Sequence, residues 1–194
     1  MNNEYKNVKI DSKTNIGTID FTNVLSVNVP TTYHLCKPTY DSSTGVYRVQ
    51  IPVKTLDNMD TINFAKKVWE IEQKVLTDSK LYFENWFKTV INGTNIMNFK
   101  HCISTITNEL SSFLYNGVLC FEVPESEINS IVTINGSSAS INDLLFEQHI
   151  DVTFKIHGII FDSTSFKLNM ELVKISSESG DITYLSDVSD FSDD

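Results

Sequence analysis

The residues best suited to binding a ligand lie on one predicted strand and on the loop before it. Arg48, the only arginine, projects from the polar face of the strand that the sequence VYRVQIPV predicts. Cations that follow phosphates, interleaved with aromatic rings that stack on bases, are what a groove for single-stranded nucleic acid needs. The candidates on this strand and loop are Tyr33, Lys37, Tyr40, Arg48 and Lys54. An ordinary solvated loop is the alternative.

Two further candidates, Lys155 and His157, lie on a later strand. Apolar and polar residues alternate along this strand, which predicts one buried face and one outward face that carries both candidates. They either extend the same groove or belong to a solvated face. The expected buried face of that strand comprises Ile150, Val152, Phe154, Ile156 and Ile160. Gly158 interrupts this face, which predicts strong coiling of the strand or close approach by another backbone.

The next strand pairs with this one through the turn DSTS. Its expected inward residues are Phe166, Leu168, Met170 and Leu172. Val173 and Ile175 reverse the phase of the alternation, which predicts a bulge or a strand that changes sheets.

Catalytic and metal-binding signatures are not visible in the sequence. There is no nucleophile paired with a base and no phosphate-binding loop. His34 with Cys36, and His101 with Cys102, lack the spacing of zinc fingers or ribbons. The three cysteines are an odd number that fits no disulfide framework, so we expect buried thiols in a reducing compartment. We therefore expect no enzyme, no cofactor and no metal site.

The charge of the 194-residue chain is unevenly distributed. Residues 1–100 carry 12 basic and 10 acidic side chains, residues 101–177 carry 3 and 9, and residues 178–194 carry 6 acidic side chains and no basic one. The basic character thus lies in the N-terminal half, and the last residues form an acidic tail. The polar N-terminus and the lack of a long apolar run predict an intracellular, soluble protein that is not secreted and has no membrane span.

The order of periodic segments predicts an α+β domain with an antiparallel sheet and a helical insert at about residues 60–114. Strands are predicted at 17–29, 46–53 and 117–123, with a hairpin turn at Asn135 and Gly136. Helices are predicted from Asp60 as the N-cap, from about Ser79, and across residues 99–114. The first of these is expected to bury a wide apolar stripe of Phe64, Val68, Ile71 and Val75, with Ala65, Trp69 and Leu76 beside them. The second of these is expected to bury Phe83, Trp86, Phe87, Val90 and Ile91.

Trp86 and Phe87 have two interpretations. They are able to stack on bases, yet they lie on an apolar helical stripe, which is typical of core residues.

Three stretches together resemble the single-stranded DNA-binding proteins of large nucleocytoplasmic DNA viruses. They are the aromatic segment SKLYFENWFK, the short hairpin around Asn135 and Gly136, and the closing hairpin HGIIFDSTSFKLNMELVKI. In the last stretch Ile160 stands where that family usually has Trp, and Lys167 where it usually has Gly.

The resemblance implies an OB-fold-like barrel with a helical insert, here residues 1–177, followed by the tail at 178–194. It is similar in layout to phage single-stranded DNA-binding proteins that end in an acidic tail. The implied function is sequence-independent binding of single-stranded DNA in viral DNA replication, recombination or repair, in the host cytoplasm or nucleus. The oligomeric state and the preference for DNA over RNA stay open.

In such proteins the tail competes with DNA for the basic groove and offers docking residues to replication proteins. The residues that would take this role here are Tyr184, Asp187, Asp190, Phe191, Asp193 and Asp194. A plain solubilising tail is the alternative. The competing function for the whole chain is a non-catalytic virion component or assembly adaptor on the same barrel, which the net charge of −10 favours.

Overall fold

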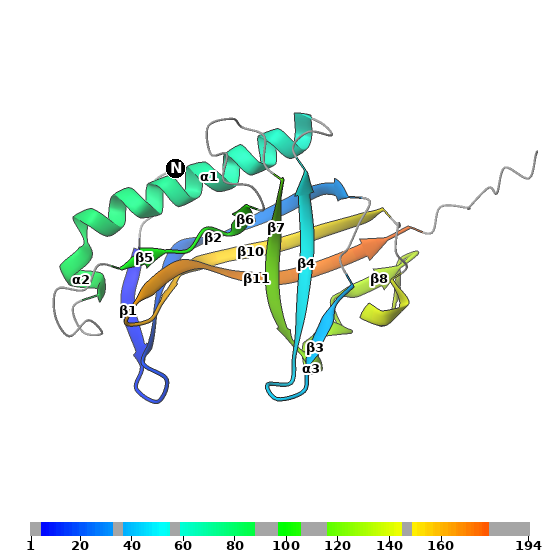
Figure 1. Ribbon diagram of the computed structural model, residues 1–194, viewed down its shortest axis with the longest axis horizontal. Coiled ribbons are helices and arrows are strands. Elements are labelled where there is room, and N and C mark those ends of the chain that lie inside the picture. The colour runs from blue at the N-terminus through cyan, green and yellow to red at the C-terminus, as the bar shows by residue number, and fades with distance from the viewer. Residues whose placement is uncertain are drawn as a thin grey trace, which may run out of the picture.

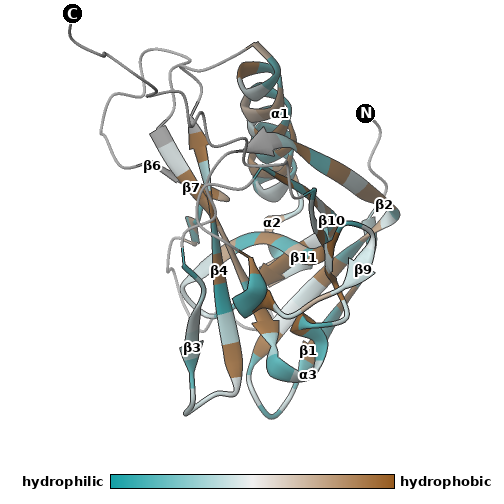
Figure 2. Cartoon of the chain, turned by 90° about the vertical axis from the view of Figure 1, so that its right-hand side faces the viewer, coloured by the Kyte–Doolittle hydropathy of each residue, from teal (hydrophilic) through white to brown (hydrophobic). Residues whose placement is uncertain are grey.

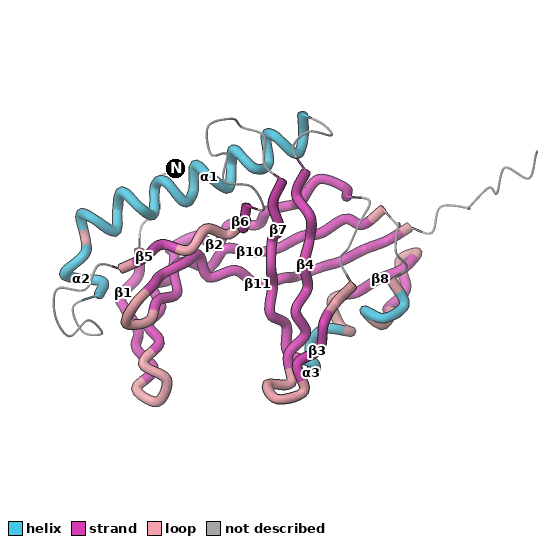
Figure 3. The backbone as a smooth tube through the Cα atoms, in the orientation of Figure 1, coloured by secondary structure: helices cyan, strands magenta, loops and turns pink. Residues whose placement is uncertain are grey.

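Two β-sheets and one long helix make up the α+β fold seen in the computed structural model (Figure 1). The structure describes residues 5–32, 37–54, 59–87, 97–105, 116–144 and 149–178. The strands of the smaller sheet cross steeply over the strands of the larger one (Figure 3). The strand pairs of the described residues keep the two sheets separate and do not close into a barrel.

The larger sheet has seven strands, with β1, β2, β10, β11, β8 and β9 in that order and β5 beside β11. Their bounds are β1 Tyr5–Asp11, β2 Ile16–Thr32, β5 Asn98–Phe99, β8 Val132–Ile134, β9 Ser137–Ser138, β10 Ile150–Phe161 and β11 Ser165–Ser177. β5 and β8 run parallel to β11, so the sheet is mixed, and the prediction of a purely antiparallel sheet was wrong. The predicted hairpin is confirmed, because Asn135 and Gly136 adopt the positive φ angles of a type I′ turn between β8 and β9.

The smaller sheet has four antiparallel strands in the order β3, β4, β7 and β6. Their bounds are β3 Thr39–Asp41, β4 Val46–Lys54, β6 Ile103–Thr105 and β7 Asn116–Pro124. Hydrophobic and hydrophilic residues alternate along β4 (Figure 2), and its buried residues Val49, Ile51 and Val53 are those that the alternation predicted. Among the described strands, β3 pairs only with the first three residues of β4, so no described strand pairs with β4 on its outer side beside Pro52, where the missing N–H of proline is tolerated.

The helices are α1 Met59–Leu81, α2 Phe83–Phe87, α3 Glu125–Ile128 and a short 3-10 helix at Ile141–Asp143. Helix α1 lies along the larger sheet, packs on β2 and β4, and buries the predicted residues Phe64, Val68, Ile71 and Val75 (Figure 1). The three layers meet at Phe154 of β10, whose ring lies 6.4 Å from Phe64 and 5.3 Å from Phe121 of β7. No helix in the described residues is long and apolar enough to cross a membrane.

The helical predictions were wrong at three places. Helix α1 begins at Met59, so Asp60 lies in its first turn, where it favours the helix dipole, instead of capping it. The helix also runs through Ser79 to Leu81, and the next helix starts only at Phe83, which is exposed. The predicted helix at 99–114 is wrong in its described part, because Phe99 and Ile103–Thr105 belong to strands.

Two irregularities bend the central strands β10 and β11. Their register shifts between Ile156 and Gly158, and again opposite Val173, where the phase reversal predicted a bulge. Beyond Gly158 the buried residues are Ile159 and Phe161, so the prediction that Ile160 faces the core was wrong. The shift by one residue exchanges the two faces of the strand.

Gly158 also lets the neighbouring strand approach closely, as its position predicted. It has a φ of +158°, and a Cβ placed there would lie 2.0 Å from the carbonyl oxygen of Ile19 and 2.8 Å from the Cα of Asp20. These atoms belong to β2, which pairs antiparallel with β10 and whose register against it shifts between Ile156 and Gly158. Only glycine fits this close approach without displacement of the backbone of β2.

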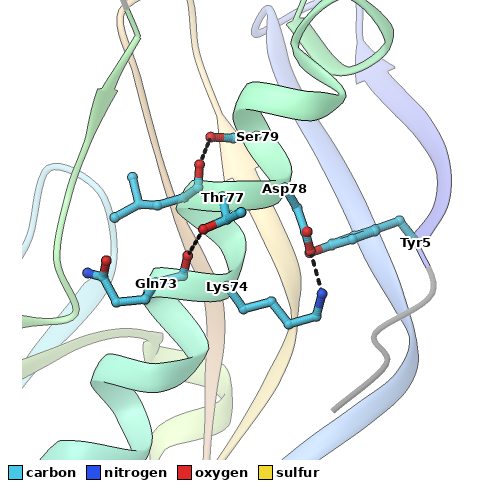
Figure 4. Close-up of polar contacts among 7 residues, drawn as sticks. Tyr5, Gln73, Lys74, Thr77, Asp78 and Ser79 are labelled. Atoms are coloured by element: carbon cyan, nitrogen blue, oxygen red, sulfur yellow. Dashed lines mark hydrogen bonds and ion pairs between the residues drawn. The ribbon is translucent and has the colours of Figure 1, made fainter.

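The edge strand β1 is fastened to α1 at its first residue (Figure 4). The Tyr5 hydroxyl donates a hydrogen bond to Oδ2 of the buried Asp78, which also accepts one from Lys74 Nζ at 2.7 Å. Burial, together with the Asp78 carboxylate, raises the pKa of Tyr5 far above its usual value. The Tyr5 ring packs against Trp86 at 4.7 Å, and Trp86 is buried, so its interpretation as a core residue is confirmed.

We predict that Gly158→Ala lowers the free energy of unfolding by about 2 to 4 kcal/mol, because the methyl group must displace the β2 backbone. Gly45→Ala is the matched control, since Gly45 has a φ of +68° but no neighbouring atom within 4 Å of the place that a Cβ would take. It should cost only about 1 kcal/mol, from backbone conformation alone. Urea denaturation measures both, and equal losses would contradict the close approach of β2.

Candidate nucleic-acid interface

The first set of predicted site residues does not form one cationic face. The β3–β4 register pairs Tyr40 with Tyr47 and Thr39 with Arg48, so Tyr40 and Arg48 lie on opposite faces of the smaller sheet. Each also has an acidic partner. The Tyr40 hydroxyl donates to Glu125 at 2.6 Å, which raises the pKa of that tyrosine, and Arg48 forms an ion pair with Glu122 at 3.4 Å.

The second set lies on the other sheet. Lys155 and His157 project from the outer face of β10, where His157 Nε2 lies 2.5 Å from Glu171 Oε2 on β11. Polar side chains continue along this face, where the Thr153 hydroxyl donates a hydrogen bond to Asn28. It therefore has the features of a solvated face.

The remaining predicted residues are less informative. Lys37 is exposed just before β3. Tyr33 and the side chain of Lys54 lie outside the described residues. The same holds for all the tail residues, which are Tyr184, Asp187, Asp190, Phe191, Asp193 and Asp194.

The structure instead shows a cavity of about 750 Å³ beside α1. It exists because β5 pairs with only the first two residues of β11 before the chain crosses over to β6, at the edge of the smaller sheet. We call the crossing residues Lys100–Cys102 the bridge. The cavity is lined by residues of α1, of the bridge, of β7 and of β11, together with Ile103 of β6 and Ile160 of β10.

A buried carboxylate holds the bridge against α1. Glu72 is only 4 % exposed. One of its oxygens accepts a hydrogen bond from the Cys102 N–H at 2.6 Å, and the other lies 2.8 Å from Nδ1 of His101. The hydrogen bond to Glu72 raises the pKa of His101, and it outweighs the opposing effect of burial. The pair therefore favours an imidazolium at the cavity, with Nδ1 occupied by Glu72.

The two thiols of the cavity are neutral. Burial raises the pKa of Cys102 well above its usual value and the Glu72 carboxylate adds to this, while the positive charge of Lys167 acts in the opposite direction. Burial also raises the pKa of Cys120, with Arg48 opposing it. Neither thiol is an activated nucleophile. In the part of the chain that the structure describes, no group of three or more His, Cys, Asp or Glu side chains is placed to hold a metal ion.

The groups that remain to contact a ligand are aromatic and basic. Trp69 of α1 lines the cavity and is 40 % exposed. Lys100 of the bridge and Lys167 of β11 line it too, and neither forms an ion pair with a described residue. The His101 side chain is 51 % exposed. Of the predicted site residues that the structure describes, Arg48 is connected to the cavity through its ion-pair partner Glu122, which lines it.

Sequence reasoning missed this site for two identifiable reasons. Trp69 lies at the edge of the apolar stripe of α1, next to Glu72 in the following turn, and the stripe predicted it as a core residue. The apolar spacing after Phe99 predicted a helix through Lys100 and His101, which hid their position between two sheets. A carboxylate inside the apolar stripe, as Glu72 is, was the signal that a polar segment must pack there.

No protein-family model matches this chain, and no curated protein or solved structure is significantly similar to it.

We predict that His101 makes the stability of the protein pH-dependent. Because its pKa is raised in the folded state, its stabilising contribution is complete below the unfolded value of about 6.5 and is lost as the pH rises through the folded pKa. His101→Gln should remove this loss from a series of melting temperatures measured between about pH 5.5 and 9.

If His101→Gln keeps the loss of melting temperature with rising pH, then Glu72 and His101 do not interact as described.

Proposed function

We propose that this protein binds single-stranded DNA without sequence preference and without catalysis, in the replication, recombination or repair of viral DNA. The observation that carries the proposal is the convergence of the Trp69 indole, two lysines and a protonatable imidazole around one cavity. Stacking of a base on an aromatic ring contributes about 1 to 3 kcal/mol and tolerates any base. Lysines supply the phosphate contacts, which are also independent of sequence.

The local charges of the cavity support the proposal despite the acidic composition. Residues 1–177 carry 15 basic and 19 acidic side chains, a net charge of −4. Both acidic residues that line the cavity are paired, however, Glu72 with His101 and Glu122 with Arg48. Lys100 and Lys167 are not paired in the described structure, so they set the local potential that a phosphate experiences.

We also propose that the fold is an OB-fold-like barrel that stays open. What supports this fold is the α+β content, the pair of crossing sheets and the bent strands β10 and β11. The cavity lies between β11 of the larger sheet and β7 of the smaller sheet, with the bridge and α1 as its other walls.

The acidic tail has a regulatory role in the proposal. Six carboxylates at residues 178–194 compete with DNA for the lysines of the cavity, at an effective concentration of order millimolar. Tyr184 and Phe191, between the acids, would serve as docking residues for replication proteins.

A chain that ends at Ser177 should therefore bind oligo(dT) more tightly than the full chain at low salt. Unchanged affinity would leave the tail with a solubilising role only.

A second candidate function is that of a virion component or assembly adaptor. One observation favours it: three consecutive apolar side chains are exposed where α1 meets α2, namely Leu81, Tyr82 and Phe83, at 72 %, 44 % and 39 %. Exposed apolar clusters of this kind are common in protein interfaces. The adaptor function does not require the lysines of the cavity, which is the difference that the next experiment uses.

We predict that the double variant Lys100→Ala, Lys167→Ala weakens binding of labelled oligo(dT). Each lost phosphate contact should also reduce the dependence of log K on log salt concentration by about 0.7, so the slope should become shallower by about 1.4. Fluorescence anisotropy titrations at several salt concentrations measure both quantities.

The matched control is Lys155→Ala, Lys174→Ala, which removes the same charge from the outer face of the larger sheet. It should bind nearly as the wild type does. If both double variants lose affinity equally, binding is a diffuse charge effect and the cavity is not the site. If the wild type has no affinity at low salt, the adaptor function replaces this proposal.

A further inference from the structure

We infer that the cavity captures one whole nucleotide of the strand, with its base between α1 and the sheets and its phosphate at the rim. It follows that free nucleoside monophosphates are ligands of the protein. This inference rests on the proposed function and defines its binding unit. The volume of about 750 Å³ lies within the range of about 300 to 1,000 Å³ typical of pockets that enclose a small molecule.

The walls of the cavity are apolar and come from three directions. Ala65 and Val68 of α1, Phe121 of β7, and Leu168 and Met170 of β11 all line it. A platform for bases that stack on the surface needs only one aromatic ring, whereas apolar walls on several sides suit a base that has left the stack and is enclosed.

The other polar groups that line the cavity are compatible with a bound base. Both oxygens of Glu72 are occupied by the bridge, as described above. The Cys102 sulfur is a neutral thiol, because burial raises its pKa well above its usual value. Asn169 lines the cavity with an amide that both donates and accepts, so it is able to pair with the edge of any base. The site should therefore enclose a base without selecting one.

The rim carries the groups that a phosphate requires. Lys100 and Lys167 supply two ammonium groups from neighbouring segments, because the Lys100 N–H donates a hydrogen bond to the carbonyl oxygen of Phe166 on β11 at 2.9 Å. His101 adds a third donor, because Glu72 occupies Nδ1 and leaves Nε2 as the nitrogen available to a ligand. Three donors beside one apolar cavity match the terminal phosphate of a monophosphate as well as a phosphodiester within a strand.

Enclosure of the base has a consequence for the choice of nucleic acid. A paired base is unable to enter the cavity unless it leaves the duplex, which costs a few kcal/mol. A single strand presents its bases without that cost. The cavity thus gives a physical reason for preference of single over double strands.

The test is competition against labelled oligo(dT) by dTMP and dAMP, with thymidine, deoxyribose 5-phosphate and inorganic phosphate as partial ligands. Both nucleotides should displace the oligonucleotide, and each partial ligand should be weaker by about tenfold or more, because it lacks either the stacked base or the phosphate.

A variant that fills the cavity provides a second measurement. Met170→Trp places a large side chain inside it without changing the charged rim. It should abolish competition by nucleotides and weaken oligo(dT) binding. Met59→Trp makes the same exchange at a position that is 67 % exposed and should change neither.

The outcomes separate this inference from the proposed function. If the wild type binds oligo(dT) but no nucleotide competes, or if deoxyribose 5-phosphate competes equally well, nucleotide capture is wrong while single-strand binding stands. If oligo(dT) itself does not bind, the proposed function fails and this inference fails with it.

Discussion

The hydrogen bonds of the Glu72 carboxylate are the interaction on which the rest of the site depends. A buried charge that loses its partners destabilises a protein by about 3 to 5 kcal/mol, so Glu72 must be satisfied wherever α1 packs. Its partners are the Cys102 N–H and the His101 ring, both on the bridge. The carboxylate therefore fixes the path of the bridge between the sheets. It also determines which nitrogen of His101 is left for a ligand.

The bent central strands supply the second constraint. β10 and β11 must curve to follow α1 at one end and to support the smaller sheet at the other, and two register shifts permit this. The shift at Gly158 turns Ile160 and Lys167 away from the core and toward the cavity. Without it, Ile160 would lie in the core as the simple alternation predicts. Lys167, which pairs with Ile160 on β11, would then not face the cavity. The position of a lysine that lines the cavity is thus linked to a glycine on the neighbouring strand.

Local patterns were sufficient to predict much of the fold. The alternation in β4, the helical stripe of α1 and the Asn135 and Gly136 turn were each predicted correctly, because each depends on neighbours in sequence. The segment from Phe99 onward was not, since its apolar spacing fits a helix while its hydrogen-bond partners lie on β11 and β7. Contacts between residues far apart in sequence decided the structure there, and they override local periodicity. The same limit explains why the site was sought on Arg48 and its loop: sequence shows which residues are basic, but not that Glu122 neutralises this arginine.

In the proposed function, single-stranded DNA enters the cavity between α1 and the bridge. The most direct measurement is photocrosslinking of an oligonucleotide that carries 5-iodouracil at every second position, followed by identification of the modified peptides by mass spectrometry. The account predicts that the crosslinks concentrate on Trp69 and His101, the two exposed rings at the cavity. Crosslinks concentrated on Tyr40, or on His157 at the outer face of β10, would contradict it.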